Sequence, residues 1–241
     1  MTRPLVRVFL LLTLVGVTTV AVEPLSQQVR EWEIFRVRQV LVEGNQLVSD
    51  SQVVAALALE PGSSIWDDKK EWVQRLRAHP VIREVRIRRG VPTTLNVSVE
   101  ERRPVAFVPG PTLFPVDGTG QSLPLELPTL AALDLPLLPA GLPAEELTAL
   151  AGEVERLLRD EPGFSALLSH LERNASGGWV AHLTSPRVEI HFQLPLTSAR
   201  LRDGFRVLED ALERDPQRPP AAVDLRFADQ VVLSLASRNG R

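Results

Sequence analysis

Four histidines are the side chains of this chain best suited to bind a metal, and they lie at His79, His170, His182 and His191. No two of them are four residues apart, the spacing that places two ligands on one face of a zinc-protease helix. The chain has no cysteine, so thiolate ligands and disulfides are excluded. His182 and His191 could approach each other across a hairpin, but the sequence offers them no third ligand. We therefore predict no metal site and no cofactor.

Catalytic arrangements of serine, glycine and carboxylate residues are also not found. No serine stands in the Gly-x-Ser-x-Gly elbow of the α/β-hydrolases. The segment Asp117-Gly118-Thr119-Gly120 is too short for a phosphate-binding loop and lacks the helix that should follow one, so it predicts a turn. Two predicted helices of the second half carry carboxylates on their polar faces, namely Glu145, Glu146, Glu153, Glu155, Glu209, Asp210 and Glu213. The sequence therefore predicts that the protein is not an enzyme.

The start of the chain combines basic residues with an apolar run. Arg3 and Arg7 precede the run, and Glu23 and Pro24 end it. A retained membrane-spanning helix and a cleaved signal peptide both fit this pattern, and we favour the retained anchor. Either interpretation places the remaining chain outside the cytoplasm. The expected segments are a cytoplasmic tail at 1–7, a transmembrane anchor at 8–22 and a juxtamembrane connector at 23–34.

Residues 35–104 contain a hairpin with one apolar face. Arg83 to Arg89 alternates apolar and basic side chains, and Leu95 to Val99 alternates again after a Gly/Pro turn. Two possible capping boxes, beginning at Ser49 and Asp68, predict two helices before the hairpin. Phe35 to Val42 predicts an earlier strand with a bend. The expected order is strand, helix, helix, strand, strand, with both helices on one face of the sheet.

Residues 105–241 predict a second domain. Prolines recur from Pro109 to Pro143, which limits that stretch to short strands and turns. Apolar residues at helical spacing predict helices over 147–158 and 201–212. Alternating patterns predict strands at 179–183, 187–192, 223–227 and 231–235.

Taken in order, these motifs resemble the FtsQ/DivIB family of bacterial cell-division proteins. The matching segments are Val42-Glu43-Gly44-Asn45, His79-Pro80-x-Ile82, Val85-x-Ile87-x-Arg89-x-x-Pro92-x-x-Leu95, Glu101-Arg102-x-Pro104-Val105-Ala106 and Val223 to Phe227. The resemblance implies an α+β protein with an N-terminal transmembrane helix. A POTRA domain (β-α-α-β-β) would follow at 35–104, and then a mostly antiparallel β domain with two flanking helices at 105–241. Arg200 and Arg202 stand where the family commonly has a lysine.

The resemblance implies a non-enzymatic divisome scaffold, anchored in the bacterial inner membrane at the division septum. Its partners would be FtsB- or DivIC-like and FtsL-like membrane proteins and other divisome members, which control septal peptidoglycan synthesis. The closing strand suggests how a partner binds, because little chain remains to cover its edge and a peptide could add to it as a further strand. The candidate partner-binding residues are Val223, Asp224, Leu225, Arg226, Phe227, Val231, Val232, Leu233, Ser234 and Leu235.

A second, weaker docking surface is the basic patch of the first domain, formed by Arg83, Arg86, Arg88 and Arg89. Nucleic acid is not expected outside the cytoplasm, so this patch favours a protein partner or solubility. Two other functions remain open. A POTRA-containing component of outer-membrane protein assembly or secretion would need a C-terminal β-barrel, which the two amphipathic helices argue against. An exported enzyme with an unrecognised active site is the third reading.

Overall fold

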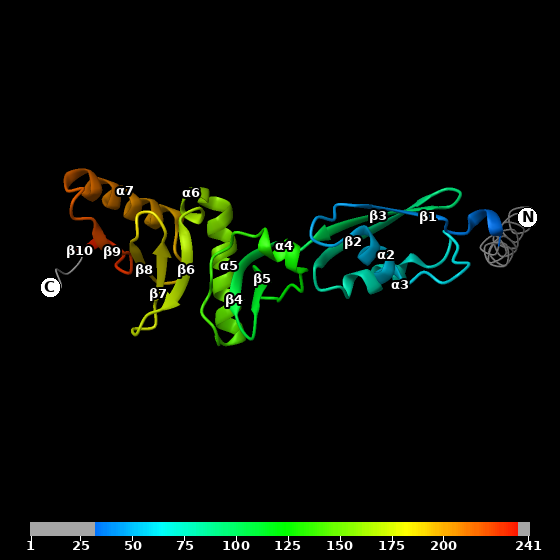
Figure 1. Ribbon diagram of the computed structural model, residues 1–241, viewed down its shortest axis with the longest axis horizontal. Helices are drawn as coiled ribbons and strands as arrows, with labels where there is room; N and C mark the ends of the chain where they lie inside the picture. The colour runs from blue at the N-terminus through cyan, green and yellow to red at the C-terminus, as the bar shows by residue number, and fades with distance from the viewer. Residues whose placement is uncertain (1–31, 236–241) are drawn as a thin grey trace, which may run out of the picture. The chain divides into compact units, whose positions relative to one another are not determined.

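The computed structural model describes residues 32–235, which form two compact units that divide between Glu101 and Arg102 (Figure 1). The expected cytoplasmic tail, the expected anchor and most of the expected connector lie outside the described residues. Within 32–235 no helix combines the length and the apolar character needed to cross a membrane.

The first unit is a three-stranded sheet with two helices. Its strands are β1 (Gln39–Glu43), β2 (Ile82–Gly90) and β3 (Thr94–Glu101), in the order β1-β3-β2. β1 runs parallel to β3, and β2 runs antiparallel to it. The helices α2 (Asp50–Leu57) and α3 (Lys69–Arg77) bury Val53, Leu57, Trp72 and Leu76. This order of elements is the one that the sequence predicts.

Local hydrogen bonds explain where the helices of the first unit begin. The Ser49 hydroxyl accepts from the Gln52 N–H and the Gln52 side chain accepts from the Ser49 N–H, so the predicted capping box forms. Asp68 caps α3 by accepting from the Lys70 N–H. The second predicted box is wrong, because the Glu71 carboxylate pairs with Arg75 at 3.3 Å instead.

The first strand is shorter than predicted. Phe35 belongs to a short 3-10 helix, η1 (Glu33–Phe35), and its carbonyl accepts from the Ile65 N–H. The Val37 N–H donates to the Ser63 carbonyl, so this stretch bonds to the loop after α2 and not to the sheet. The Phe35 ring packs edge-on against Trp66, which gives its apolar side chain a partner outside the sheet.

The second unit is built on a five-stranded sheet in the order β10-β9-β8-β7-β6. All neighbours are antiparallel except β8 and β9, which are parallel and joined through the long helix α7. The bounds are β6 (Leu168–Arg173), β7 (Trp179–Leu183), β8 (Glu189–Phe192), α7 (Ser198–Arg214), β9 (Pro220–Asp224) and β10 (Val232–Leu235). The helix α5 (Ala144–Asp160) precedes them, and with α7 it confirms the two predicted helices.

Strands β4 (Pro104–Pro109) and β5 (Leu113–Asp117) form a two-stranded ribbon. Leu137 links this ribbon to the five-stranded sheet, because it bridges to Phe107 of β4 on one side and to His170 of β6 on the other. The Leu137 N–H donates to the Ser169 carbonyl and the Leu137 carbonyl accepts from the Leu171 N–H. On the other side the Phe107 carbonyl accepts from the Leu138 N–H at 2.8 Å. The ribbon and the five strands therefore share one core, to which α5 and α7 both contribute.

Four elements of the second unit differ from the sequence prediction. Strand β9 ends at Asp224, whereas the sequence predicts a strand over 223–227. Strand β6 is absent from that prediction. The short helix α4 (Leu127–Ala131) lies in the proline-rich stretch, where Pro128 occupies the first turn and needs no hydrogen-bonded N–H. A second short helix, α6 (Pro162–Ser165), also begins with a proline.

Candidate partner-binding edge

Strand β10 is the last strand of the sheet in the second unit and is coloured orange-red in Figure 1. It pairs antiparallel with β9, with Val232 opposite Asp224 and Leu233 opposite Val223. Among residues 32–235 no strand pairs with its other side. An edge strand of this kind presents a row of backbone N–H and C=O groups that a second chain can pair with.

The candidate residues around this edge differ in what they expose. Val223 and Leu225 are 1% and 5% exposed and belong to the core of the unit. The side chains of these two candidate partner-binding residues therefore pack in the core and are not available at the surface. Phe227, Val232 and Leu235 are the large apolar side chains on the surface, at 45%, 38% and 62% exposure.

Arg200 on α7 fixes the loop that joins β9 to β10. Its guanidinium donates to the carbonyl of Leu225 at 3.4 Å and also to the carbonyls of Phe227 and Gln230. A planar guanidinium can reach several acceptors at once, which a lysine ammonium on the same stem does less well. The sequence shows only an arginine in place of the family's lysine and gives no sign of this role.

Asp224 and Arg226 form an ion pair at the end of β9. The Arg226 guanidinium donates to both carboxylate oxygens of Asp224, with Nη2 2.6 Å from Oδ2 and Nε 2.9 Å from Oδ1. It also donates to the Ser176 hydroxyl at 3.1 Å, which ties β9 to the turn between β6 and β7. These bonds from Arg226 hold the pKa of Asp224 below its usual value against the opposing effect of burial.

A groove of about 290 Å³ runs between α7 and β10. Its apolar lining comes from Val207 and Ala211 on the helix and Leu233 and Leu235 on the strand. Arg214 and Asp210 form an ion pair of 2.7 Å at its charged rim. An edge of free backbone groups beside an apolar groove can bind an extended peptide and seat one of its side chains.

The basic patch of the first unit is divided between two faces of β2. Arg89 points toward the helices, where its guanidinium donates to the carbonyls of Ile65 and Asp67 and lies 5.3 Å from the centre of the Trp66 ring. The structure therefore excludes Arg89 from the predicted docking surface. Arg83 pairs with Glu100 at 2.6 Å and Arg86 with Glu84 at 3.7 Å, so of the other three arginines Arg88 is the one without an ion pair among the described residues.

The turn after β5 forms as predicted from the segment that begins at Asp117. The Asp117 carboxylate accepts from the N–H and hydroxyl of Thr119, from the Gln121 N–H and from Arg102 at 2.9 Å. Burial acts to raise the pKa of Asp117, but these donated bonds outweigh it and hold the pKa below its usual value. Gly120 has a positive φ of 79°, which suits the turn.

Comparisons with known proteins cover both units. Residues 35–102 match the POTRA domain, FtsQ-type. Cell division protein FtsQ of Anaeromyxobacter sp. (strain K) is 28% identical over 212 residues, which span 86% of this chain and 69% of that protein. FtsQ of Neisseria meningitidis serogroup B is 28% identical over 210 residues, which span 83% of each chain.

Relatives named DivIB match as well. Cell division protein DivIB of Geobacillus kaustophilus is 26% identical over 123 residues, half of this chain and 47% of that protein. The solved extracytoplasmic domain of DivIB from Geobacillus stearothermophilus covers 48% of this chain at 18% identity and a TM-score of 0.35, too low to add to the argument. The FtsQ-type POTRA match over residues 35–102, the FtsQ sequences matched along most of the chain and the DivIB sequence matched along half of it support the assignment of this chain to the FtsQ/DivIB family of bacterial cell-division proteins.

Proposed function

We propose that this protein is a non-enzymatic scaffold of bacterial cell division, which binds FtsB- or DivIC-like and FtsL-like membrane proteins through strand β10. Its relatives are named cell division proteins, which supports the role in division. The observation that carries the binding mode is the position of β10 at the end of the five-stranded sheet. By holding these partners the scaffold takes part in regulating septal peptidoglycan synthesis.

The mechanism is the addition of a partner strand to β10. Backbone N–H and C=O groups of the partner pair with those of β10, and every second side chain of the partner turns toward the groove beside α7. Leu233 and Leu235 offer that side chain an apolar surface. Arg200 holds the preceding loop in place before the partner arrives, so less conformational freedom is lost on binding.

The proposed location is the inner membrane at the division septum, with the amino terminus in the cytoplasm. The basic start and the apolar run over 8–22 support this location. The intact mass of protein purified from cells tests the anchor, because a mass that lacks the first residues through Ala21 would show cleavage and overturn it.

Proline substitutions on β10 test the binding mode. Consecutive residues of a strand direct their N–H groups to opposite sides, so Val232→Pro and Leu233→Pro each remove an N–H from a different side. The variant whose lost N–H faces outward should abolish co-purification of the FtsB-like partner and leave the second unit folded. The other variant should disturb the pairing of β10 with β9.

Leu113→Pro is the matched control, because Leu113 is an exposed first residue of β5, far along the sheet from β10. This variant should retain the partner. Crosslinking in dividing cells followed by pull-down of the tagged full chain gives the readout, and circular dichroism reports the fold. If both β10 variants bind the partner as the unsubstituted chain does, strand addition is wrong.

A further inference from the structure

Three neighbouring strands of the second unit bring histidines and glutamates to one face of the sheet. His170 on β6 lies opposite His182 on β7, and His182 lies opposite Glu189 on β8. Glu172 and His191 occupy the next positions on the same face of β6 and β8, two residues further along their strands. The alternate residues Leu171, Ala181 and Ile190 are buried in the core, so this polar cluster lies on the outer face.

Glu172 places a carboxylate between two histidine nitrogens. Its Oε1 atom is 3.6 Å from Nε2 of His170, and its Oε2 atom is 3.5 Å from Nε2 of His182. One ligand atom from each of the three residues lies within 4.8 Å of the other two. Zinc bonds of about 2.0–2.2 Å in a tetrahedron separate neighbouring ligand atoms by about 3.3–3.6 Å. The three groups are therefore close to the spacing that a bound ion requires.

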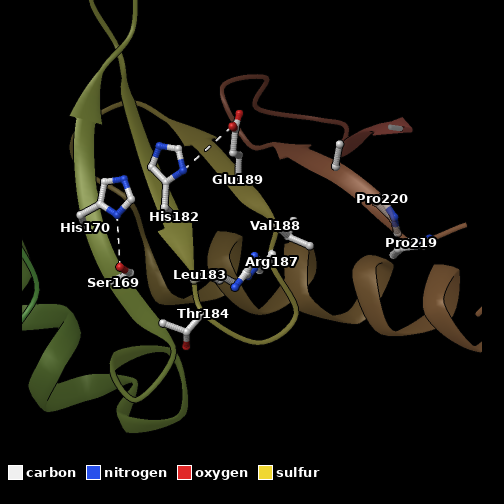
Figure 2. A pocket seen from close by; sticks show the side chains of 11 residues that line it. Ser169, His170, His182, Leu183, Thr184, Arg187, Val188, Glu189, Pro219 and Pro220 are labelled. Atoms are coloured by element: carbon white, nitrogen blue, oxygen red, sulfur yellow. Dashed lines mark hydrogen bonds and ion pairs between the residues drawn. The ribbon is translucent and has the colours of Figure 1, made fainter. Parts of the chain in front are cut away.

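The other nitrogen of each histidine already has a polar neighbour (Figure 2). Nδ1 of His170 is 3.2 Å from the Ser169 hydroxyl, and Nδ1 of His182 is 4.0 Å from a carboxylate oxygen of Glu189. Nε2 of His182 is buried and has no hydrogen-bond partner among the described residues. In metal-bound histidines the second ring nitrogen typically donates to a carboxylate, a backbone carbonyl or a water, and the Glu189 carboxylate is a partner of this kind beside His182.

The cluster is accessible from solvent. The Glu172 side chain is 63% exposed, and a cavity of about 620 Å³ opens beside His170, His182 and Glu189 (Figure 2). The two imidazole rings are stacked, with centroids 4.1 Å apart and an angle of 5° between their planes. Parallel rings hold their nitrogens side by side, so a bound ion needs a small tilt of the rings toward each other.

We propose that His170, Glu172 and His182 form a binding site for a divalent transition-metal ion of the Zn²⁺ type, with Ser169 and Glu189 orienting the two imidazoles. Two imidazoles and one carboxylate are a donor set that suits Zn²⁺ and leaves a coordination position open toward the cavity. The ion joins β6 to β7 at the place where Leu137 pairs with His170. It therefore strengthens the sheet where the β4–β5 ribbon is attached.

Zinc titration of the full chain tests the site. The protein is purified in detergent with a histidine-free affinity tag, stripped with a chelator, and titrated with Zn²⁺ in the presence of a chromogenic competitor. One Zn²⁺ should bind per chain, and Zn²⁺ should raise the thermal unfolding temperature. Loss of a residue that only orients a ligand typically lowers metal affinity by about 10–100-fold. His170→Asn, Glu172→Gln and His182→Asn should each lower the affinity for Zn²⁺ by more than this, because each removes a ligand.

Two variants serve as controls. His79→Asn alters a histidine of the first unit, and His191→Asn alters one that contacts Glu189 at 3.2 Å without belonging to the ligand set. Both should bind Zn²⁺ about as the unsubstituted chain does, and circular dichroism should show every variant folded. Three outcomes overturn the proposal: no zinc binding by the unsubstituted chain, equal binding by the three ligand variants, or loss of binding in either control.

Discussion

Gly44, at the end of β1, occupies a position that no other residue fits. Its φ is +86°, and a Cβ atom there would lie 2.3 Å from the Val99 carbonyl oxygen. A residue other than glycine in such a backbone conformation costs about 1–3 kcal/mol. Gly44→Ala should lower the free energy of unfolding of the first unit by more than this, because the clash with Val99 adds to the strain. The free energy of unfolding in urea gives the measurement.

Gly62→Ala provides the matched comparison for that clash. Gly62 also has a positive φ, +97°, but nothing lies within 4 Å of its would-be Cβ. Gly62→Ala should lower the free energy of unfolding only through backbone strain, by about 1–3 kcal/mol or less. Equal losses in the two variants would show that the contact with Val99 has no energetic effect.

At the residue scale, the sequence reveals contacts between near neighbours better than contacts set by strand register. The Ser49–Gln52 capping box is a four-residue pattern, and it forms as predicted. The contact of His182 with His170 depends on how β6 and β7 align, and the sequence prediction contains no β6. The sequence therefore suggests a pairing of His182 with His191 and gives no sign that His170 and Glu172 lie beside His182.

At the element scale, the β9–β10 loop depends on one side chain of α7. Arg200→Lys keeps the positive charge but loses the fork that reaches three carbonyls. Each bond from a charged donor contributes about 1.5–3 kcal/mol, so the amides of β10 should exchange with solvent at least about tenfold faster. Hydrogen exchange measured by mass spectrometry or NMR reports the change.

Arg202→Lys is the control for the loop. Arg202 lies two residues further along α7, is 65% exposed at its side chain, and is 3.7 Å from Glu161. This substitution should leave the exchange of β10 unchanged. If both variants show the same exchange as the unsubstituted chain, Arg200 does not control the loop.

Elements with a regular apolar period could be predicted, and those shaped by tertiary contacts could not. α5 and α7 carry long stripes of helical spacing, and β7 and β10 match their predicted ranges closely. The sequence pattern does not reveal β6, because its buried residues Leu168 and Leu171 are three positions apart and not two. A register shift between Leu168 and His170 interrupts the alternation of the strand. The alternating pattern predicts β10, but its position at the end of the sheet is set by its pairing with β9. The pattern does not predict the burial of Leu225, which lies one residue beyond the end of β9.

For the molecule as a whole, stability in acid should depend on two carboxylates of the second unit. The pKa values of Asp117 and Asp224 are both lowered by folding. Their stabilising contribution is complete above the unfolded pKa of about 3.9 and is lost as the pH falls through the lower folded value. The unfolding free energy of the second unit should therefore begin to fall below about pH 5.

Urea unfolding at a series of pH values measures this dependence. Asp117→Asn and Asp224→Asn should each make the acid side of the profile flatter, because the substituted side chain no longer takes up a proton on unfolding. Asp229→Asn, in the exposed part of the β9–β10 loop, is the control and should retain the original slope. Profiles that overlap for all three variants would contradict the prediction.

The two strands at the proposed docking edge, β9 and β10, follow all the other described strands of the second unit along the chain. β9 and β10 follow α7, so a nascent chain that ends at Arg214 exposes β8 as the outer strand and has no groove. Domains generally fold as units once their residues have been translated. Under the proposed mechanism, a chain that lacks β9 and β10 would have neither the docking edge nor the groove and should not bind the partner's peptide.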